Sequence, residues 1–258
     1  MINIAITAGG TSESMDGVRK ITNISTGSLG WHCLEAVLTK FNTPSAADFH
    51  IHYIHTENAI IKELAEKDKK KVHFIPVTDA ESVFQAVDKL TKEVELDYFI
   101  HSMAISDFTF SYSVSTIRLA QEIEALQSAD GFTDECVRSI LENPLSKHST
   151  GEKISSDDDI LIGLKRTKKV IPLIKKNDSN TFLVGFKLLA NVNETELLRV
   201  ANELAEKNGC DLVVANEVSA IGETNHQAIL VKDKKIIARA VGKFDIAKLI
   251  IDSMMDGR

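Results

Sequence analysis

Cysteine and long apolar runs are scarce in this sequence of 258 residues. The three cysteines, Cys33, Cys136 and Cys210, are scattered and lack metal-ligand spacing, which argues against a disulfide framework and a zinc site. No apolar run approaches the roughly 18 residues of a membrane-spanning helix. The first residues show neither the basic run nor the apolar region of a signal peptide. We therefore expect a cytoplasmic protein without membrane contact.

Positive charge is in the minority, with 30 lysines and arginines against 37 aspartates and glutamates and a net charge of -7. This balance argues against non-specific nucleic-acid binding, which needs a basic surface. It is still compatible with a local anion site, because the local field decides binding there. The remaining composition, 43% hydrophobic and 26% charged, is that of a globular protein with a sizeable core.

Strand and helix patterns alternate along the chain. Strands are predicted at 2–7, 49–55, 72–76, 97–102, 182–186, 211–215, 227–232 and 235–240. Helices are predicted at 28–41, 58–68, 79–94, 158–176, 193–208 and 242–254. This alternation predicts an α/β fold with a doubly wound, mostly parallel, Rossmann-like sheet. The last two strands flank "KDK", which predicts a C-terminal antiparallel hairpin.

Residues 108–157 break this rhythm. Amphipathic helices fit 116–127 and 133–142, a Ser, Lys and Gly stretch at 146–152 looks flexible, and no strand is predicted before 182. We interpret the segment as an excursion inserted into one domain that covers 1–258. It would serve as a flap or a dimer contact.

Ligands in open α/β sheets bind beyond the carboxyl ends of the strands. The first such loop is unusually long: about twenty polar residues precede the helix at 28–41, where about two to six would suffice. "STGSLG" opens that helix, and a helix N-terminus presents free N–H groups to an anion. The loop is neither a P-loop nor a dinucleotide GxGxxG fingerprint. The candidate nucleotide-binding residues in it are Gly9, Gly10, Thr11, Ser25, Thr26 and Gly27.

Three further segments place unusual residues at predicted strand ends. "HSMAISDFTF" offers small residues for close backbone approach and Asp107 for a metal, a ribose or a helix cap. "GFK" places Phe186 and Lys187 at the ligand edge, where Phe186 either stacks on a base or covers the core. Asn216 ends another strand and either hydrogen-bonds a ligand or caps a turn.

In combination, these segments resemble one family. "TAGGTSESMDGVRKITNISTGSLG", "MAISDF", "EKIS", "LVGFK" and "DLVVANEVS" are similar, in this order, to the segments of phosphopantothenoylcysteine synthetase, also called phosphopantothenate–cysteine ligase. The resemblance spans nearly the whole chain. The family's fused flavin-binding decarboxylase domain is missing from the sequence, so the resemblance implies a stand-alone bacterial type.

The resemblance implies roles for the opening loop. Asn23 falls on the family's asparagine that contacts the activated acyl intermediate, so it is implied to be catalytic and substrate-binding. Ser25, Thr26 and Gly27 fall on the nucleotide-phosphate loop.

Roles are implied for residues further along the chain as well. Met103 and Ala104 fall where the backbone contacts the base, and Asp107 falls on an acidic residue near the nucleotide and its metal. Lys153 falls on the first lysine of a K-x-K-K motif, whose later lysines are replaced here by Ser155 and Ser156. Phe186 and Lys207 fall on nucleotide-pocket positions, and Asn216 remains a candidate for substrate binding.

The implied reaction joins 4′-phosphopantothenate to L-cysteine in coenzyme A biosynthesis. The carboxylate attacks the α-phosphorus of CTP or ATP with Mg²⁺ present, pyrophosphate leaves, and the cysteine amine then displaces the nucleotide from the acyl-nucleotide. Between the two nucleotides we favour CTP. The family implies a homodimer.

Other classes of function stay open on the sequence alone. A nicotinamide oxidoreductase would share the fold but needs the glycine fingerprint. A flavin-binding decarboxylase would need a catalytic His and a Cys-bearing flap. A non-catalytic nucleotide-binding module would keep the opening loop but would not need Asn23.

Overall fold

The computed structural model describes residues 1–43, 47–127, 132–149, 159–217 and 226–256. The chain divides into two compact units. The first comprises Met1–Thr11, Ile24–Ile105 and Lys169–Arg258, and the second comprises Ser12–Asn23 and Ser106–Lys168. The longer segment of the second unit contains the whole of the expected excursion at 108–157 and extends past it on both sides. The shorter segment is part of the opening loop.

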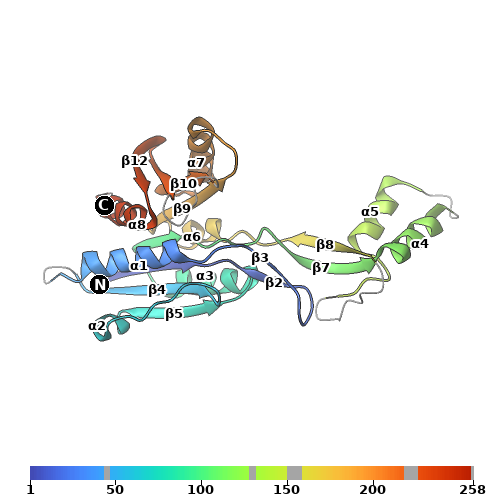
Figure 1. Ribbon diagram of the computed structural model, residues 1–258, viewed down its shortest axis with the longest axis horizontal. Coiled ribbons are helices and arrows are strands. Elements are labelled where there is room, and N and C mark those ends of the chain that lie inside the picture. Colours follow the sequence, from blue (N-terminus) through green and yellow to red (C-terminus); the bar gives the residue numbers. More distant parts are fainter. Residues whose placement is uncertain (44–46, 128–131, 150–158, 218–225, 257–258) are drawn as a thin grey trace. The chain divides into compact units, whose positions relative to one another are not determined.

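The first unit is built on an eight-stranded sheet in the order β12-β11-β10-β9-β6-β1-β4-β5 (Figure 1). Its strands are β1 (Ile2–Ala8), β4 (Phe49–Thr56), β5 (Val72–Val77), β6 (Tyr98–His101), β9 (Phe182–Leu189), β10 (Leu212–Glu217), β11 (Gln227–Lys232) and β12 (Lys235–Val241). The strands from β5 to β10 pair in parallel, and β11 and β12 add antiparallel neighbours at one edge. The predicted fold class, including the C-terminal antiparallel hairpin, is confirmed.

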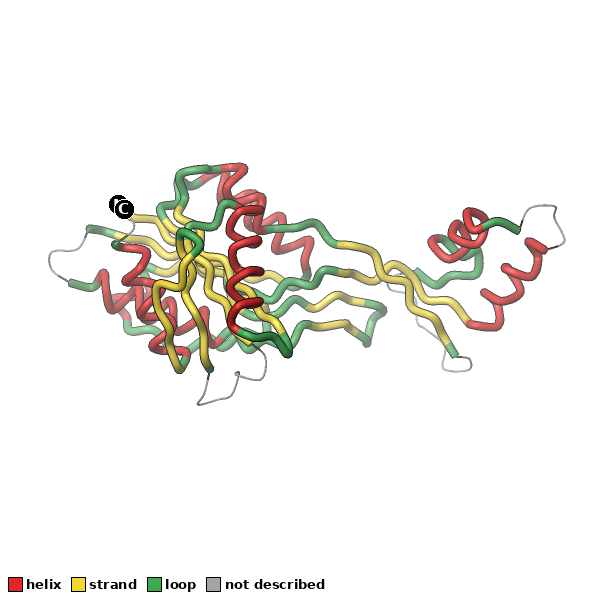
Figure 2. The backbone as a smooth tube through the Cα atoms, turned by 90° about the horizontal axis from the view of Figure 1, so that it is seen from above, coloured by secondary structure: helices red, strands yellow, loops and turns green. Residues whose placement is uncertain are grey.

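Helices cover both faces of this sheet (Figure 2). The helices are α1 (Ser28–Phe41), α2 (Glu66–Lys69), α3 (Ala80–Glu93), α6 (Ile171–Asn177), α7 (Glu194–Asn208) and α8 (Lys243–Met255). Side chains of α1 and α8 form one core with Ile4 and Ile6, whereas α3 and α6 pack with Ala5 on the opposite face. Successive strand residues point to opposite faces, so these apolar runs are buried on both sides.

The described residues of the second unit form two small antiparallel strand pairs and two helices. Its elements are β2 (Ser12–Ser14), β3 (Lys20–Thr22), β7 (Phe108–Ser115), α4 (Thr116–Gln127), α5 (Asp134–Glu142) and β8 (Ile160–Arg166). β2 pairs with β3, and β7 pairs with β8. The helices predicted at 116–127 and 133–142 are confirmed as α4 and α5.

Two other helix predictions are only partly correct. Within 58–68, only the last three residues are helical, as the start of α2, because the preceding residues cross the start of α1, where the Ile60 N–H donates to the Thr26 carbonyl. Within 158–176, only the end is helical, as α6, and the first part contains strand β8, which also contradicts the prediction of no strand before 182. β8 pairs with the unpredicted strand β7, and Gly163 gives room for the Tyr112 ring, which would lie 2.2 Å from an added Cβ.

No helix among the described residues has both the length and the apolar character needed to cross a bilayer.

Candidate functional site

The strand order places a switch point between β1 and β6. The chain runs outward from β1 to β4 and β5, then returns to lay β6 against the other side of β1. Crossovers leave in opposite directions at such a point, which opens a crevice beyond the carboxyl ends of the two strands. The loops that follow Ala8 and His101 lie at this crevice, which is where the sequence predicted a ligand.

These two loops are joined to each other by their backbones. The Ala104 N–H donates to the Gly9 carbonyl at 2.9 Å, and the Thr11 N–H donates to the Ala104 carbonyl at 3.1 Å. Gly10 and Ala104 form a parallel bridge. The pairing of β1 with β6 is thus extended beyond both strands, and Gly9, Gly10, Thr11 and Ala104 are brought together.

The start of α1 crosses this loop at close range. Gly27 has φ of 66° and Gly9 has φ of 99°, both in the region that favours glycine. A Cβ on Gly27 would lie 2.8 Å from the Gly9 backbone nitrogen. Only glycine at residue 27 permits both the left-handed turn and this approach, so α1 begins directly against the loop after β1.

The N-terminus of α1 lacks the groups that ordinarily satisfy a helix start. Gly27 is its N-cap residue, no side chain caps it, and its first turn has no acidic residue. The Ser25 hydroxyl lies 3.4 Å from the Gly27 nitrogen, and the Thr26 hydroxyl donates to Ser28. The predicted phosphate-loop residues therefore surround backbone N–H groups that a bound anion would satisfy.

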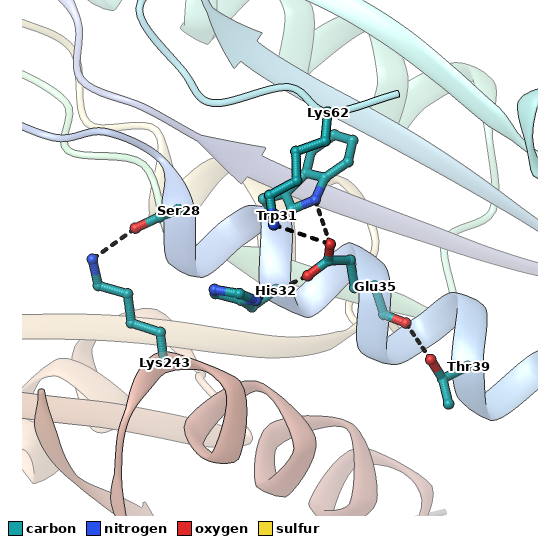
Figure 3. Close-up of polar contacts among 7 residues, drawn as sticks. All are labelled: Ser28, Trp31, His32, Glu35, Thr39, Lys62 and Lys243. Atoms are coloured by element: carbon teal, nitrogen blue, oxygen red, sulfur yellow. Dashed lines mark hydrogen bonds and ion pairs between the residues drawn. The ribbon is translucent and has the colours of Figure 1, made fainter. Parts of the chain in front are cut away.

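A lysine from the far end of the chain also reaches this helix start. Lys243 opens α8, and its Nζ donates to the Ser28 hydroxyl at 2.7 Å (Figure 3). No ion pair joins Lys243 to a carboxylate within the described part of the chain. A cation at the positive end of a helix dipole is unfavourable by itself, so the arrangement suits an anion. Lys243 was not predicted as a site residue, because no local sequence pattern marks it.

Further along α1, one carboxylate collects three donors (Figure 3). Glu35 accepts from Trp31 Nε1 at 2.8 Å, and its other oxygen lies 2.9 Å from His32 Nδ1. Lys62 Nζ lies 3.3 Å from Glu35 and so ties the segment after β4 to the helix. Burial opposes ionisation of Glu35, but the bonds from Trp31 and Lys62 outweigh it and hold its pKa below the ordinary value.

The loop after β6 presents backbone rather than side chain. Met103 is 7% exposed, and its side chain packs in the core with Phe99 and Leu183. Its bulk is therefore directed away from the loop surface, and Ala104 follows it as a small, half-buried residue. The approach of a flat group to this backbone stays a prediction.

The other predicted residues of the first unit separate into two groups. Phe186 and Lys187 follow Gly185, which pairs with His101, so they lie at the same sheet edge as the β6 loop. Asn216 is buried beside them on β10, and its side-chain nitrogen lies 3.2 Å from His226 Nε2. Burial and the charge of Lys243 lower the pKa of His226.

Lys207, in contrast, lies away from these residues. It is exposed in the last turn of α7, and that turn leads to the amino end of strand β10, opposite the carboxyl ends where the other predicted residues lie.

Two predicted residues belong to the second unit, and one lies outside the described residues. Asn23 is half-buried directly after β3. Asp107 is exposed, and its backbone carbonyl accepts from the Thr167 N–H at 3.0 Å. Lys153, with Ser155 and Ser156, falls in 150–158, outside the described part of the chain. No group of three His, Cys, Asp or Glu side chains suited to a metal occurs among the described residues.

Comparison with known proteins gives a family match over most of the chain. The model of the DNA/pantothenate metabolism flavoprotein C-terminal domain matches residues 2–123 and 145–257. The protein named coenzyme A biosynthesis bifunctional protein CoaBC is 26% identical over 88% of this chain in Thermococcus kodakarensis and 24% identical over 97% in Methanocaldococcus jannaschii. The chain covers 44% and 50% of these two relatives, about half their length.

Solved structures give the same comparison in three dimensions. The DNA/pantothenate metabolism flavoprotein from Streptococcus pneumoniae is 28% identical, with a TM-score of 0.79 and 100% coverage of both chains. A Cab2 mutant in complex with phosphopantothenate-cysteine has a TM-score of 0.66 over 99% of this chain and 85% of that one. At 16% identity, the second match shows a common fold.

Proposed function

This chain belongs to the family of the DNA/pantothenate metabolism flavoprotein C-terminal domain, and from that membership we propose that it is a ligase joining 4′-phosphopantothenate to L-cysteine in coenzyme A biosynthesis. The family resemblance inferred from the sequence is confirmed by the match. Because the match includes residues of both compact units, we treat the two as parts of one synthetase domain.

The observation that carries the proposal is the uncapped start of α1 beside the β1–β6 switch point. It offers backbone N–H groups, the hydroxyls of Ser25 and Thr26, and the ammonium of Lys243. These donors suit the phosphates of a nucleoside triphosphate. A second anion, the substrate carboxylate, has to approach the same polyanion, so positioning and charge neutralisation are what the protein supplies.

The reaction divides into two displacements. The phosphopantothenate carboxylate attacks the α-phosphorus, forming an acyl–phosphate bond while pyrophosphate leaves. The cysteine amine then attacks the acyl carbon, forming the amide while the nucleoside monophosphate leaves with the bonding electrons. Asn23 donates to the acyl carbonyl in this proposal, and Asn216 contributes to substrate binding. Phe186 and Lys187 line the nucleotide site.

Magnesium fits the donor set as a phosphate-bound ion. Mg²⁺ is usually held by one or two carboxylates, water and substrate phosphates. Asp107 offers one exposed carboxylate, which agrees with the lack of a larger ligand cluster among the described residues. Mg²⁺ would neutralise phosphate charge when bound. Lys153 and Lys207 remain proposed nucleotide-binding residues on the sequence resemblance alone. The same resemblance is the basis for proposing that the protein is a homodimer, and a cytoplasmic location is proposed with it.

The nucleotide is proposed to be CTP rather than ATP. The N–H groups of Met103 and Ala104 already donate to Thr7 and Gly9, so in this proposal the backbone carbonyls of this segment accept from the amino group of cytosine. A polar group left unpaired by the wrong base costs about 1–3 kcal/mol, so kcat/KM for CTP should exceed that for ATP by about 5- to 150-fold.

Pyrophosphate release measured with each nucleotide, with and without phosphopantothenate and cysteine, tests both the nucleotide assignment and the ligase reaction. Equal values or a preference for ATP would reject the CTP assignment. Release that does not require both co-substrates would reject the ligase.

Lys243→Gln should raise KM for the nucleotide about tenfold, because it removes a charged donor from the start of α1. Lys243→Arg keeps the charge and should remain within a few-fold of wild type. Lys248→Gln removes an exposed lysine from the same helix and serves as the control. Nucleotide affinity can be measured by equilibrium titration and compared with the kinetics. A normal affinity in folded Lys243→Gln would show that the phosphates bind elsewhere.

A further inference from the structure

One buried threonine holds three consecutive residues at the end of β6. Thr7 is 0% exposed and lies near the carboxyl end of β1. Its hydroxyl accepts from the Met103 N–H at 3.1 Å and lies 3.1 Å from His101 Nδ1. Its carbonyl accepts from the Ser102 hydroxyl at 2.6 Å. The Thr7–His101 contact lies at the last ladder pair, and the bonds to Ser102 and Met103 act beyond it, on the loop that follows the strand.

The proton positions in this junction follow from its donors. The Met103 N–H is a donor, so the Thr7 oxygen accepts there, and no other acceptor for the Thr7 hydroxyl hydrogen is recorded among the described residues. That hydrogen is therefore directed to His101 Nδ1, which places the ring proton on Nε2. Burial lowers the pKa of His101 to about 4, so the ring is neutral near pH 7 and able to accept.

Helix α1 rests on the same junction. A Cβ on Gly30 would lie 3.0 Å from the Ser102 hydroxyl oxygen and 3.2 Å from the Thr7 carbonyl oxygen. The first turn of α1 is thus packed against the Thr7–Ser102 bond. Thr7 therefore contacts both elements: its carbonyl lies against the start of the helix, and its hydroxyl binds the backbone that leads to Ala104.

We propose that Thr7 and His101 are a positioning pair that sets the distance between the start of α1 and the Met103–Ala104 backbone, and thereby the nucleotide that the site accepts. The inference rests on the proposed function, in which the first element binds phosphates and the second reads the base. For stability alone, apolar residues of similar shape at both positions can be nearly neutral. Its polar character is useful for orienting the loop.

Matched variants separate the hydroxyl from the shape of the side chain. Thr7→Val keeps the shape and removes the hydroxyl, and Thr7→Ser keeps the hydroxyl. Thr7→Val should weaken binding of the preferred nucleotide about tenfold and reduce the CTP-to-ATP ratio, while KM for cysteine stays within about twofold. Thr7→Ser should restore both. If Thr7→Val fails to fold, His101→Leu and His101→Asn form a second pair, since the Asn oxygen can replace Nδ1 as acceptor.

Equilibrium titration with CTP and ATP decides the inference independently of turnover. Nitrogen NMR of His101 should show the Nε2–H tautomer in wild type and Thr7→Ser, and a changed signal in Thr7→Val. Unchanged nucleotide affinity and ratio in folded Thr7→Val would overturn the proposal, as would equal losses in Thr7→Ser. Wild-type protein that binds CTP but forms no amide would reject the ligase assignment, and the binding comparison would still decide the role of Thr7.

Discussion

Asn23→Asp should slow amide formation about 10²- to 10³-fold while pyrophosphate release in the first step changes much less. The substitution preserves the shape of the side chain, removes its N–H donor and adds a negative charge. The acyl carbonyl gains negative charge as the cysteine amine attacks, and loss of one preorganised donor typically costs this much in rate. Rapid-quench measurements of pyrophosphate and of the amide product would resolve the two steps.

Asn180→Asp is the matched control for Asn23→Asp. It makes the same change at an exposed position two residues before β9. It should leave both steps within about twofold of wild type, because exposed charges are well screened. If Asn23→Asp forms the amide at the wild-type rate, Asn23 is not the donor, and the sequence resemblance has assigned the role to the wrong residue.

The sheet could be read from the sequence because each of its strands is a local signal. β1, β9 and β10 begin as short runs of mostly apolar residues, and α1 has the same bounds, 28–41, in prediction and structure. A run that is buried on both faces must be apolar along its whole length. Once the strands alternate with helices, few topologies remain, and the edge that binds a ligand follows.

The opening loop was only partly predictable. Its glycines and hydroxyls pointed to an anion site, but strands β2 and β3 within it were not expected. Three-residue strands carry almost no periodicity. Their turn is held by Asp16, whose Oδ1 accepts from the Val18 and Arg19 N–H groups at 2.8 and 2.7 Å. Part of the loop's polarity therefore serves its own backbone.

The contacts between residues far apart in the chain could not be predicted from the sequence. Lys243 and Ser28 are 215 residues apart, and Thr7 is separated from His101 by 94 and from Met103 by 96. Lys243, Thr7 and His101 do not differ locally from ordinary helix or strand positions. These three became recognisable as site residues only when the fold brought them to the switch point, whereas Gly27 was recognisable from both its sequence and its geometry.

Gly27→Ala should reduce nucleotide binding about 10²-fold and leave most of the fold intact. A left-handed conformation costs a residue with a Cβ about 1–2 kcal/mol, and φ at Gly27 is 66°. The new methyl would also lie 2.8 Å from the Gly9 nitrogen and 3.1 Å from the Ala59 Cβ, so the start of α1 has to move away from the loop after β1. A displacement of about 1 Å in a binding constellation can cost about 10²-fold.

Gly17→Ala is the control, because a Cβ there meets no atom within 4 Å and its φ is not positive. Its nucleotide affinity should equal that of wild type. Circular dichroism and thermal unfolding of Gly27→Ala would show whether the sheet persists, since the core of α1 lies further along the helix at Leu34, Val37 and Leu38. A folded Gly27→Ala variant with normal nucleotide affinity would mean that the helix start does not hold the phosphates. The close approach of Gly27 to Gly9 would then serve packing alone.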